Sequence, residues 1–304
     1  MVNLLRTLHA RPELARNIIK FNASLYPVTL DTSPPSLFGN WHRQWSVNHE
    51  RSLPNTTLES IRHMVNIKSL TLRDFDWLET LCRGLVQNLL SVTTSLAYLT
   101  ALVIKGHQFS DLSNRRDCSP QISRILLSQP LLGRLRLRSG GWDLERHIRQ
   151  SDIPRLSYLK AERGEDGVII YGGPITSLDI RFIRTVPSLD VWKALAVSTA
   201  PITSMTLNVS DHIIPVVGMV AIYVKDVQEL VINGVLFNQI PLIIDAFPSF
   251  PCLRNLHFVV WDLWDGPKNG GMCKKMNENQ RMDAIESIRL RCPQFQNLEI
   301  RQKC

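Results

Sequence analysis

The sequence predicts an α/β solenoid, in which parallel strands stack into a concave sheet and helices or loops connect them on the convex side. Two heptads that nearly repeat, the recurrence of their pattern along the chain, and prolines ahead of it predict this fold. The clearest pair is PITSLDI, Pro174–Ile180, and PITSMTL, Pro201–Leu207, which lie 27 residues apart. Repeats of this length are typical of stacked units, because one unit cannot bury its apolar face alone.

Aligning the two heptads gives a pattern of an aliphatic residue, two others, a leucine-like residue, one other and a second aliphatic residue. The pattern occurs nine times, and leucine occupies its middle position in eight of the nine. The middle residues are Leu70, Leu102, Leu135, Leu159, Leu178, Met205, Leu230, Leu256 and Leu298. Successive middle residues lie 19 to 42 residues apart. The alternation predicts strands with one buried face.

Proline lies one or two residues before the first aliphatic position in six of the nine copies. These are Pro130, Pro154, Pro174, Pro201, Pro251 and Pro293. With 17 prolines in 304 residues, about one such placement is expected by chance. Because proline lacks an N–H, we predict that it opens each strand. Thr176 and Thr203 then lie before the strand, where sequence matters least for packing.

Segments between the predicted strands favour helices. Residues 78–90 place leucines near the 3.6-residue spacing, and Ser119 with Pro120 resembles the start of a helix. Residues 279–292 supply a final helix before the last strand. The apolar run at 213–223 is shorter than the ~20 residues that span a bilayer and contains Pro215, so we interpret it as buried structure.

Two regions depart from the repeat. Residues 1–57 are predicted to form an N-terminal helix followed by an irregular cap or loop, since 27–57 are rich in Pro, Ser and Asn. Residues 58–304 form the solenoid of about nine repeats, with an inserted loop near 261–280. The tryptophans in these loops are interpreted as anchors that pin a loop to the body.

Composition indicates a folded protein with a sizeable core, with 44% hydrophobic and 20% charged residues. The six cysteines form no C-x-x-C motif, which favours a reduced intracellular protein, cytoplasmic or nuclear. A net charge of +8 permits an anionic partner without requiring one. No apolar run is long enough for a membrane span, so no membrane partner is expected.

The strand pattern resembles leucine-rich repeats in an irregular form. More narrowly, RTLHARPELARNI, IRHMVNIKSLTL and the Pro-x-Leu-x-x-Leu segments resemble the repeat region of fungal F-box/leucine-rich-repeat proteins. The resemblance covers nearly the whole chain. It implies a leucine-rich-repeat solenoid that holds the substrate of an SCF-type ubiquitin ligase, and an F-box that binds a Skp-type adaptor. We recognise no F-box here, because the Leu53-Pro54 segment runs directly into the first clear repeat.

Motifs for catalysis are absent: the chain contains no G-x-S-x-G, P-loop, H-E-x-x-H or G-x-G-x-x-G. The eight histidines show no zinc-finger spacing to cysteine, and His107 near Asp111 or His212 beside Asp211 are interpreted as solvated loop residues. We therefore expect no enzyme activity, cofactor or metal.

The informative surface is the outward face of the strands. If the aliphatic residues point inward, the first five repeats offer fifteen outward positions with seven basic residues against Glu162 and Asp179. The last four offer twelve, with Arg301 against Glu229 and Glu299. The candidate binding residues of this concave basic face are Arg73, Lys105, Arg134, Arg136, Arg138, Tyr158, Lys160 and Arg181.

A column of guanidinium groups such as RLRLR at 134–138 suits carboxylates or phosphates. The predicted partner is therefore a protein, acidic or phosphorylated, and the predicted function is a non-catalytic interaction scaffold. A simpler interpretation is that the cations only keep an exposed face soluble. The alternative function is a nucleic-acid-binding or enzymatic protein on the same scaffold; Tyr158 is the one aromatic residue among the fifteen positions, which disfavours nucleic acid.

Overall fold

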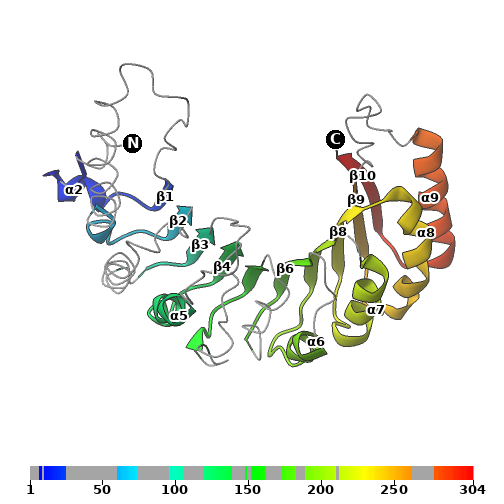
Figure 1. Ribbon diagram of the computed structural model, residues 1–304, viewed down its shortest axis with the longest axis horizontal. Coiled ribbons are helices and arrows are strands. Elements are labelled where there is room, and N and C mark those ends of the chain that lie inside the picture. The colour runs from blue at the N-terminus through cyan, green and yellow to red at the C-terminus, as the bar shows by residue number, and fades with distance from the viewer. Residues whose placement is uncertain are drawn as a thin grey trace, which may run out of the picture. The chain divides into compact units, whose positions relative to one another are not determined.

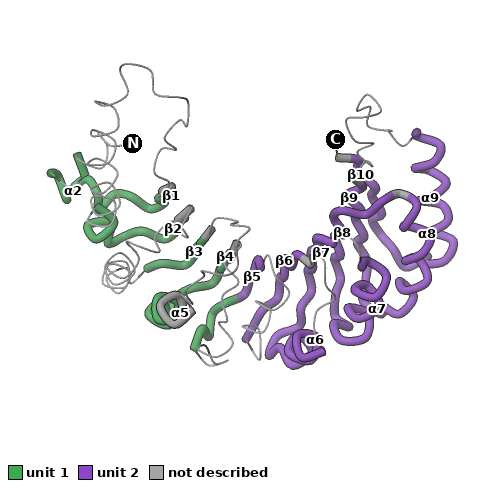
Figure 2. The backbone as a smooth tube through the Cα atoms, viewed as in Figure 1, with its two compact units in different colours: residues 1–156 green, residues 157–304 purple. Residues whose placement is uncertain are grey.

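The computed structural model describes residues 7, 8, 10–24, 60–73, 96, 98–105, 119–138, 148, 152–161, 173–182, 189–209, 212–261 and 277–303. The chain divides into two compact units, unit 1 over residues 1–156 and unit 2 over residues 157–304 (Figure 2). The helix predicted at 78–90, the cap at 27–57 and the loop residues 262–276 lie outside the described residues.

Unit 1 contains four described strands that pair side by side in chain order, each parallel to its neighbour (Figure 1). Its elements are α2 (Pro12–Ala15), β1 (Lys20–Ser24), β2 (Ser69–Arg73), β3 (Ala101–Lys105), α5 (Ser119–Leu127) and β4 (Arg134–Arg138).

Unit 2 contains six described strands, again parallel and in chain order. Its elements are β5 (Tyr158–Ala161), β6 (Ser177–Phe182), α6 (Leu189–Ala196), β7 (Ser204–Val209), α7 (Ile213–Tyr223), β8 (Glu229–Val235), η5 (Phe237–Gln239), α8 (Ile240–Ile243), η6 (Ile244–Ser249), β9 (Asn255–Trp261), α9 (Glu278–Arg291) and β10 (Asn297–Lys303). The helices line one side of this sheet, where α6 contacts α7 and α7 contacts α8 (Figure 1).

The predicted α/β class with parallel strands is confirmed, and all nine predicted strands are present. Their middle residues stand in register, as Leu70 does with Leu102 in unit 1 and Leu178 with Met205 in unit 2. Eight of the nine are at most 1% exposed, and Leu298 in β10 is half-buried. The inward rows therefore form the core of each unit, as the pattern predicts.

Strand β1 was missed, because its residues fall where the N-terminal helix was predicted. The described helix there, α2, is four residues long, and Lys20–Ser24 pair with β2 instead. Phe21 stands in register with Leu70, so pairing with a neighbouring strand outweighs the weak helical pattern of this segment. KFNAS lacks the middle leucine that marks eight of the other nine strands and the proline that precedes six of them.

The prediction that proline opens each strand is wrong, because all six prolines lie three or four residues before the first strand residue. Four of them occupy the second position of a β-turn, the position that proline's fixed φ favours. In one of these turns the Leu132 N–H donates to the Gln129 carbonyl across Pro130, at 3.1 Å. The same bond closes across Pro154, Pro251 and Pro293. Proline thus shapes the turn that precedes the strand.

A carbonyl just before each of eight strands accepts two backbone N–H groups from the start of the next strand, at 2.8 to 3.2 Å. The Thr176 carbonyl, for example, accepts from the N–H groups of Thr203 and Ser204. The Thr203 hydroxyl also donates to this carbonyl, and the Thr176 hydroxyl donates to the Ser157 carbonyl. These threonines therefore link neighbouring repeats through their side chains. From the sequence, their identity was expected to matter least for packing.

Two predicted helices are confirmed. Helix α5 begins at Ser119, and α9 spans Glu278–Arg291 behind a capping box in which Asn277 and Gln280 exchange hydrogen bonds. The run at 213–223 forms helix α7, but only part of it is buried. Ile213 and four further residues are buried, whereas Ile214 and Ile222 are exposed, so the prediction of buried structure holds for the inner side of the helix.

Candidate binding surface

The outward positions of β1–β4 form the unit 1 outer face, with three positions on each strand that alternate with the inward ones. In register, the first row is Lys20, Ser69, Ala101 and Arg134, the second is Asn22, Thr71, Val103 and Arg136, and the third is Ser24, Arg73, Lys105 and Arg138. Six of these twelve positions are basic and none is acidic. The face is therefore strongly cationic by composition.

Five of the six basic residues of this face occupy positions along two lines, and the sixth, Lys20, lies on β1. Arg73, Lys105 and Arg138 occupy one register row on adjacent strands, which lie about 4.8 Å apart in a sheet. Arg134, Arg136 and Arg138 follow one another along β4 at intervals of about 7 Å. The row and the column share the position of Arg138.

The surroundings of these cations are small or uncharged. Lys20 and Arg134 are exposed and Arg136 is half-buried. Between them on β2 and β3 lie half-buried Ser69, Thr71, Ala101 and Val103, whose side chains are short and uncharged.

The unit 2 outer face consists of the corresponding positions on β5–β10, beyond which β9 and β10 add the outward pair Trp261 and Lys303. The charges at the corresponding positions are balanced. The rows of this face are Tyr158, Ser177, Ser204, Glu229, Asn255 and Asn297; Lys160, Asp179, Thr206, Val231, His257 and Glu299; and Arg181, Asn208, Asn233, Val259 and Arg301. These seventeen positions hold three basic residues, Lys160, Arg181 and Arg301, and three acidic ones, Asp179, Glu229 and Glu299.

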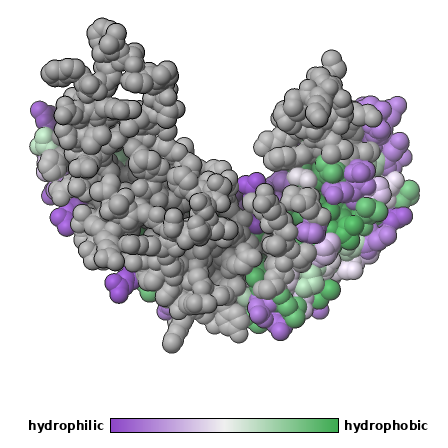
Figure 3. Space-filling view, viewed as in Figure 1, coloured by the Kyte–Doolittle hydropathy of each residue, from purple (hydrophilic) through white to green (hydrophobic). Residues whose placement is uncertain are grey.

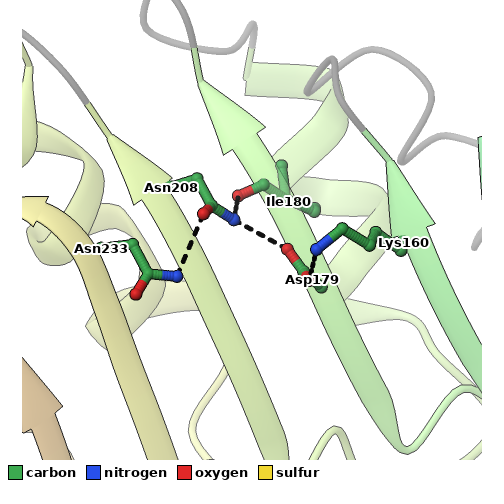
Figure 4. Close-up of polar contacts among 5 residues, drawn as sticks. All are labelled: Lys160, Asp179, Ile180, Asn208 and Asn233. Atoms are coloured by element: carbon green, nitrogen blue, oxygen red, sulfur yellow. Dashed lines mark hydrogen bonds and ion pairs between the residues drawn. The ribbon is translucent and has the colours of Figure 1, made fainter. Parts of the chain in front are cut away.

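A chain of polar contacts crosses four strands of this face (Figure 4). The Lys160 ammonium pairs with the Asp179 carboxylate on the adjacent strand, and the two side chains are 29% and 13% exposed. Asp179 also accepts a hydrogen bond from Asn208 Nδ2 at 2.7 Å, and Asn208 Oδ1 accepts one from Asn233 Nδ2 at 3.0 Å. The charge of Lys160 is thus satisfied within the sheet, as part of a contact that joins successive repeats.

The other acidic residues of the unit 2 outer face also have partners. Glu299 contacts His257 Nδ1 at 3.1 Å and accepts a hydrogen bond from Arg301, and Glu229 accepts one from the Ser204 hydroxyl at 3.2 Å. The hydrogen bond from Arg301 holds the pKa of the Glu299 carboxyl below its usual range, and the one with His257 lowers it further. The charges of this face therefore stabilise one another.

The eight predicted binding residues are divided between the two units. Arg73, Lys105, Arg134, Arg136 and Arg138 lie on the unit 1 outer face, and Tyr158, Lys160 and Arg181 on the unit 2 outer face. Sequence reasoning missed Lys20, because β1 lacks the repeat pattern, and it missed the pairing of Lys160. The sequence could have indicated this pairing, because Asp179 occupies the position in its repeat that Lys160 occupies in the preceding repeat.

Within the part of the chain that the structure describes, no helix combines the length and apolarity needed to cross a membrane. The same part holds no cluster of three or more His, Cys, Asp or Glu side chains arranged to bind a metal ion.

Comparison with known proteins finds no matching family model and no matching curated protein. Among solved structures, a Bacteroides fragilis protein is similar to 78% of this chain, with 12% identity and a TM-score of 0.49. The match covers 65% of that protein, so the chain spans less than two thirds of its length. A TM-score at this level supports no argument about function, which must come from the residues of this chain.

Proposed function

We propose that this chain is a non-catalytic protein-interaction scaffold of the leucine-rich-repeat type, and that the unit 1 outer face binds an acidic or phosphorylated segment of another protein. The observation that carries the proposal is the charge of that face, with six basic and no acidic residues among twelve positions in register. The inward positions supply the core, so these outward cations are not needed to bury the sheet.

Like charges at facing positions of adjacent strands repel one another and destabilise a sheet. Arg73, Lys105 and Arg138 occupy three adjacent positions of one register row. An anionic partner would relieve this repulsion, and arginine pairs with carboxylate or phosphate through two parallel hydrogen bonds. Electrostatic attraction would then supply a fast association rate and selectivity for anionic partners.

The layout of the charges favours a partner with several anionic groups. The row across β2–β4 extends over about 10 Å and the column along β4 over about 13 Å, from ordinary sheet spacings. A single carboxylate cannot contact both ends of either line. We therefore expect a segment with clustered Asp, Glu or phosphorylated residues, held against the face by several pairs at once.

The finer assignment, to the substrate-recognition region of an SCF-type ubiquitin ligase receptor, rests on the resemblance to fungal F-box/leucine-rich-repeat proteins. A repeat that consists of a turn, a strand with inward leucines and a helix is compatible with this assignment. Co-purification of the chain with a Skp-type adaptor tests this assignment, and failure to retain the adaptor would leave the scaffold proposal without a ligase role for this chain.

The binding proposal is tested with two fluorescent peptides, one rich in glutamate and phosphoserine and one of equal length with glutamine and serine instead. We expect the wild-type chain to bind the anionic peptide and to lose affinity as salt is raised. The triple variant Arg73→Glu, Lys105→Glu, Arg138→Glu should weaken binding at least about tenfold, equivalent to about 1.4 kcal/mol.

A matched control applies the same charge change elsewhere in unit 1, at exposed Arg11, Arg124 and Arg155. This variant has the same net charge as the first one and should bind the peptide far better. Arg136→Gln, a single milder change, serves if the triple variant does not fold. Equal losses in the two triple variants would assign the binding to net charge and refute the site, and an RNA oligomer that binds more tightly than the peptide would favour the nucleic-acid alternative.

A further inference from the structure

The exposed apolar side chains of unit 2 are interspersed with charged ones. Leu189 at the start of α6 and Val197 just after its end are each 47% exposed, and exposed Lys193, paired with Asp190, lies between them. Figure 3 shows hydrophobic residues, in green, mixed with hydrophilic ones, in purple, over the region where Figure 1 draws α6, α7 and α8. Scattered apolar residues of this kind specify no partner. The unit 1 outer face does specify one by its charge, and its geometry restricts that partner further.

The first two rows of the unit 1 outer face contain an uncharged strip that has cations on both sides. The strip consists of Ser69, Thr71, Ala101 and Val103, on β2 and β3. All four residues are half-buried. Arg134 and Arg136 border the strip on β4, and exposed Lys20 stands beyond it on β1. Since the strip is two strands wide, about 10 Å, it accommodates one extended chain, which is about 5 Å wide.

The arginines beside the strip follow one another along a single strand. Arg134 and Arg136 occupy successive outward positions of β4, and Arg138 occupies the next one. Strand geometry sets about 7 Å between successive outward positions. A partner chain that is itself extended presents side chains on one side at the same interval, because every second residue faces the same way. The spacing along β4 thus matches an extended chain with an anionic group at every second residue.

A helical partner fits this column of positions less well than an extended one. On one face of an α-helix, neighbouring side chains recur every three or four residues, so two steps cover about 9–12 Å along the axis. The first and third positions of the column are about 13 Å apart. A helix is also about 10–12 Å wide with its side chains, which is at least the full width of the uncharged strip. The geometry therefore favours an extended partner.

We propose that the unit 1 outer face binds its partner as an extended segment along β4, with an acidic or phosphorylated residue at every second position and uncharged residues between. The anionic residues pair with Arg134 and Arg136, through the two parallel hydrogen bonds that a guanidinium group offers. The residues between them project to the opposite side, over the uncharged strip, where a charged group would lose hydration without gaining a partner. This inference rests on the proposed function and specifies the conformation and the sequence pattern of the partner.

Two fluorescent peptides of identical composition test the spacing, each with three glutamates, four alanines and blocked ends. In the first the glutamates occupy positions one, three and five, and in the second they occupy positions one, four and seven. At low ionic strength we expect the wild-type chain to bind the first peptide about fivefold more tightly, the gain from about one further exposed ion pair. A third peptide has proline in place of the two alanines between the glutamates of the first. It cannot form a helix and should bind at least as tightly as the first.

Two variants of the full chain locate the bound segment. Arg136→Gln should abolish the preference for the first peptide over the second, because it interrupts the column on β4. Lys20→Gln is the matched control, since it makes the same charge change at an exposed position of the same face, on β1. It should weaken the two peptides equally and keep the preference. Fluorescence anisotropy titrations measure all of these affinities.

Equal binding of the first two peptides, tighter binding of the second, or a loss of affinity with proline overturns this inference and leaves the proposed function in place. Failure of all three peptides to bind overturns the proposed function and this inference with it. A preference that survives Arg136→Gln, or that disappears equally in Lys20→Gln, places the segment elsewhere on the face and also refutes the inference.

Discussion

The two outer faces share a scaffold and differ in their charge. In each unit the inward rows are apolar and mostly buried, and the strands pair in parallel with the same register. Outward, unit 1 carries six basic and no acidic residues in twelve positions, whereas unit 2 carries three of each in seventeen. In unit 2 the Lys160 ammonium pairs with the Asp179 carboxylate on the adjacent strand.

The comparison shows that the stacking pattern leaves outward residues free to serve either stability or recognition. Where an acid stands at the neighbouring repeat position, the cation becomes part of a bond between repeats. On the described strands of unit 1, no acidic residue occupies an outward position next to a basic one. Substitutions on the two faces should therefore affect different measurements.

The largest effects should come from the inward rows and should be alike in both units. Leu135→Ala in unit 1 and Leu230→Ala in unit 2 remove side chains that are 0% exposed. Each should lower the free energy of unfolding by about 2–5 kcal/mol, because the change loses apolar burial and leaves a cavity. Urea unfolding followed by circular dichroism measures this. A much smaller loss in one unit would show that its core is loosely packed and that the two scaffolds are not equivalent.

The next effect should appear on the unit 2 outer face. Asp179→Asn removes the charge that pairs with half-buried Lys160 and weakens the hydrogen bond from Asn208. We expect a loss of about 1–3 kcal/mol in stability, the usual range for a hydrogen bond to a charged group or for a buried polar group left unsatisfied. The same urea experiment measures it. An unchanged midpoint would mean that the polar chain contributes little and that the unit 2 face is also available for binding.

A smaller effect, of opposite sign, is expected on the unit 1 outer face. Arg136→Gln removes one of several like charges from neighbouring positions. Its effect on stability should stay within about 0.5 kcal/mol and should favour the folded state, since cross-strand repulsion falls. Thermal unfolding at low and high salt would resolve it, because the gain should shrink as salt screens the charges. A clear destabilisation would indicate that Arg136 has a structural role.

The smallest expected effect is a change in stability at low pH. The folded-state pKa of Glu299 is depressed, so its stabilising contribution is present above the unfolded-state pKa of about 4.3 and is lost as the pH falls through the folded-state value. The difference in thermal midpoint between wild type and Glu299→Gln should therefore be present near neutral pH and vanish in strong acid. Arg136→Gln, which changes a group that stays protonated throughout, should show no such convergence. A constant difference for Glu299→Gln would contradict the assignment.

Much of the fold could be predicted because its determinants are local and repeated. The middle leucines and the aliphatic residues around them specify nine strands, since each must bury the same inward row. Strand β1 escaped prediction because KFNAS becomes a strand by pairing with β2 and not through its own pattern. The prolines were correctly linked to the repeat but misplaced, because all six lie before the strand, and the β-turn that four of them shape ends before the strand begins.

The sequence predicts which residues of the candidate surface point outward, but not which of them form ion pairs with one another. Alternation alone places Arg134 and Arg136 outward, and the structure has them at such positions. Whether a cation such as Lys160 is matched depends on which residue stands beside it on the next strand, and hence on the register between repeats of unequal length. The exposed face of α7 could not be predicted, because its helix is apolar on every side and no periodicity distinguishes inner from outer residues.

The carbonyl that accepts two N–H groups at the start of the next strand has a consequence for how the chain tolerates changes in length. The same pair of bonds forms whether the acceptor and the first donor are 19 residues apart, as at Ser157 and Thr176, or 42 apart, as at Arg254 and Gln296. Closing the longer connection costs only about 0.7 kcal/mol more in chain entropy. Insertions and deletions between strands can therefore accumulate without disturbing the alignment of the strands, which makes each connection a place where a new segment can be added.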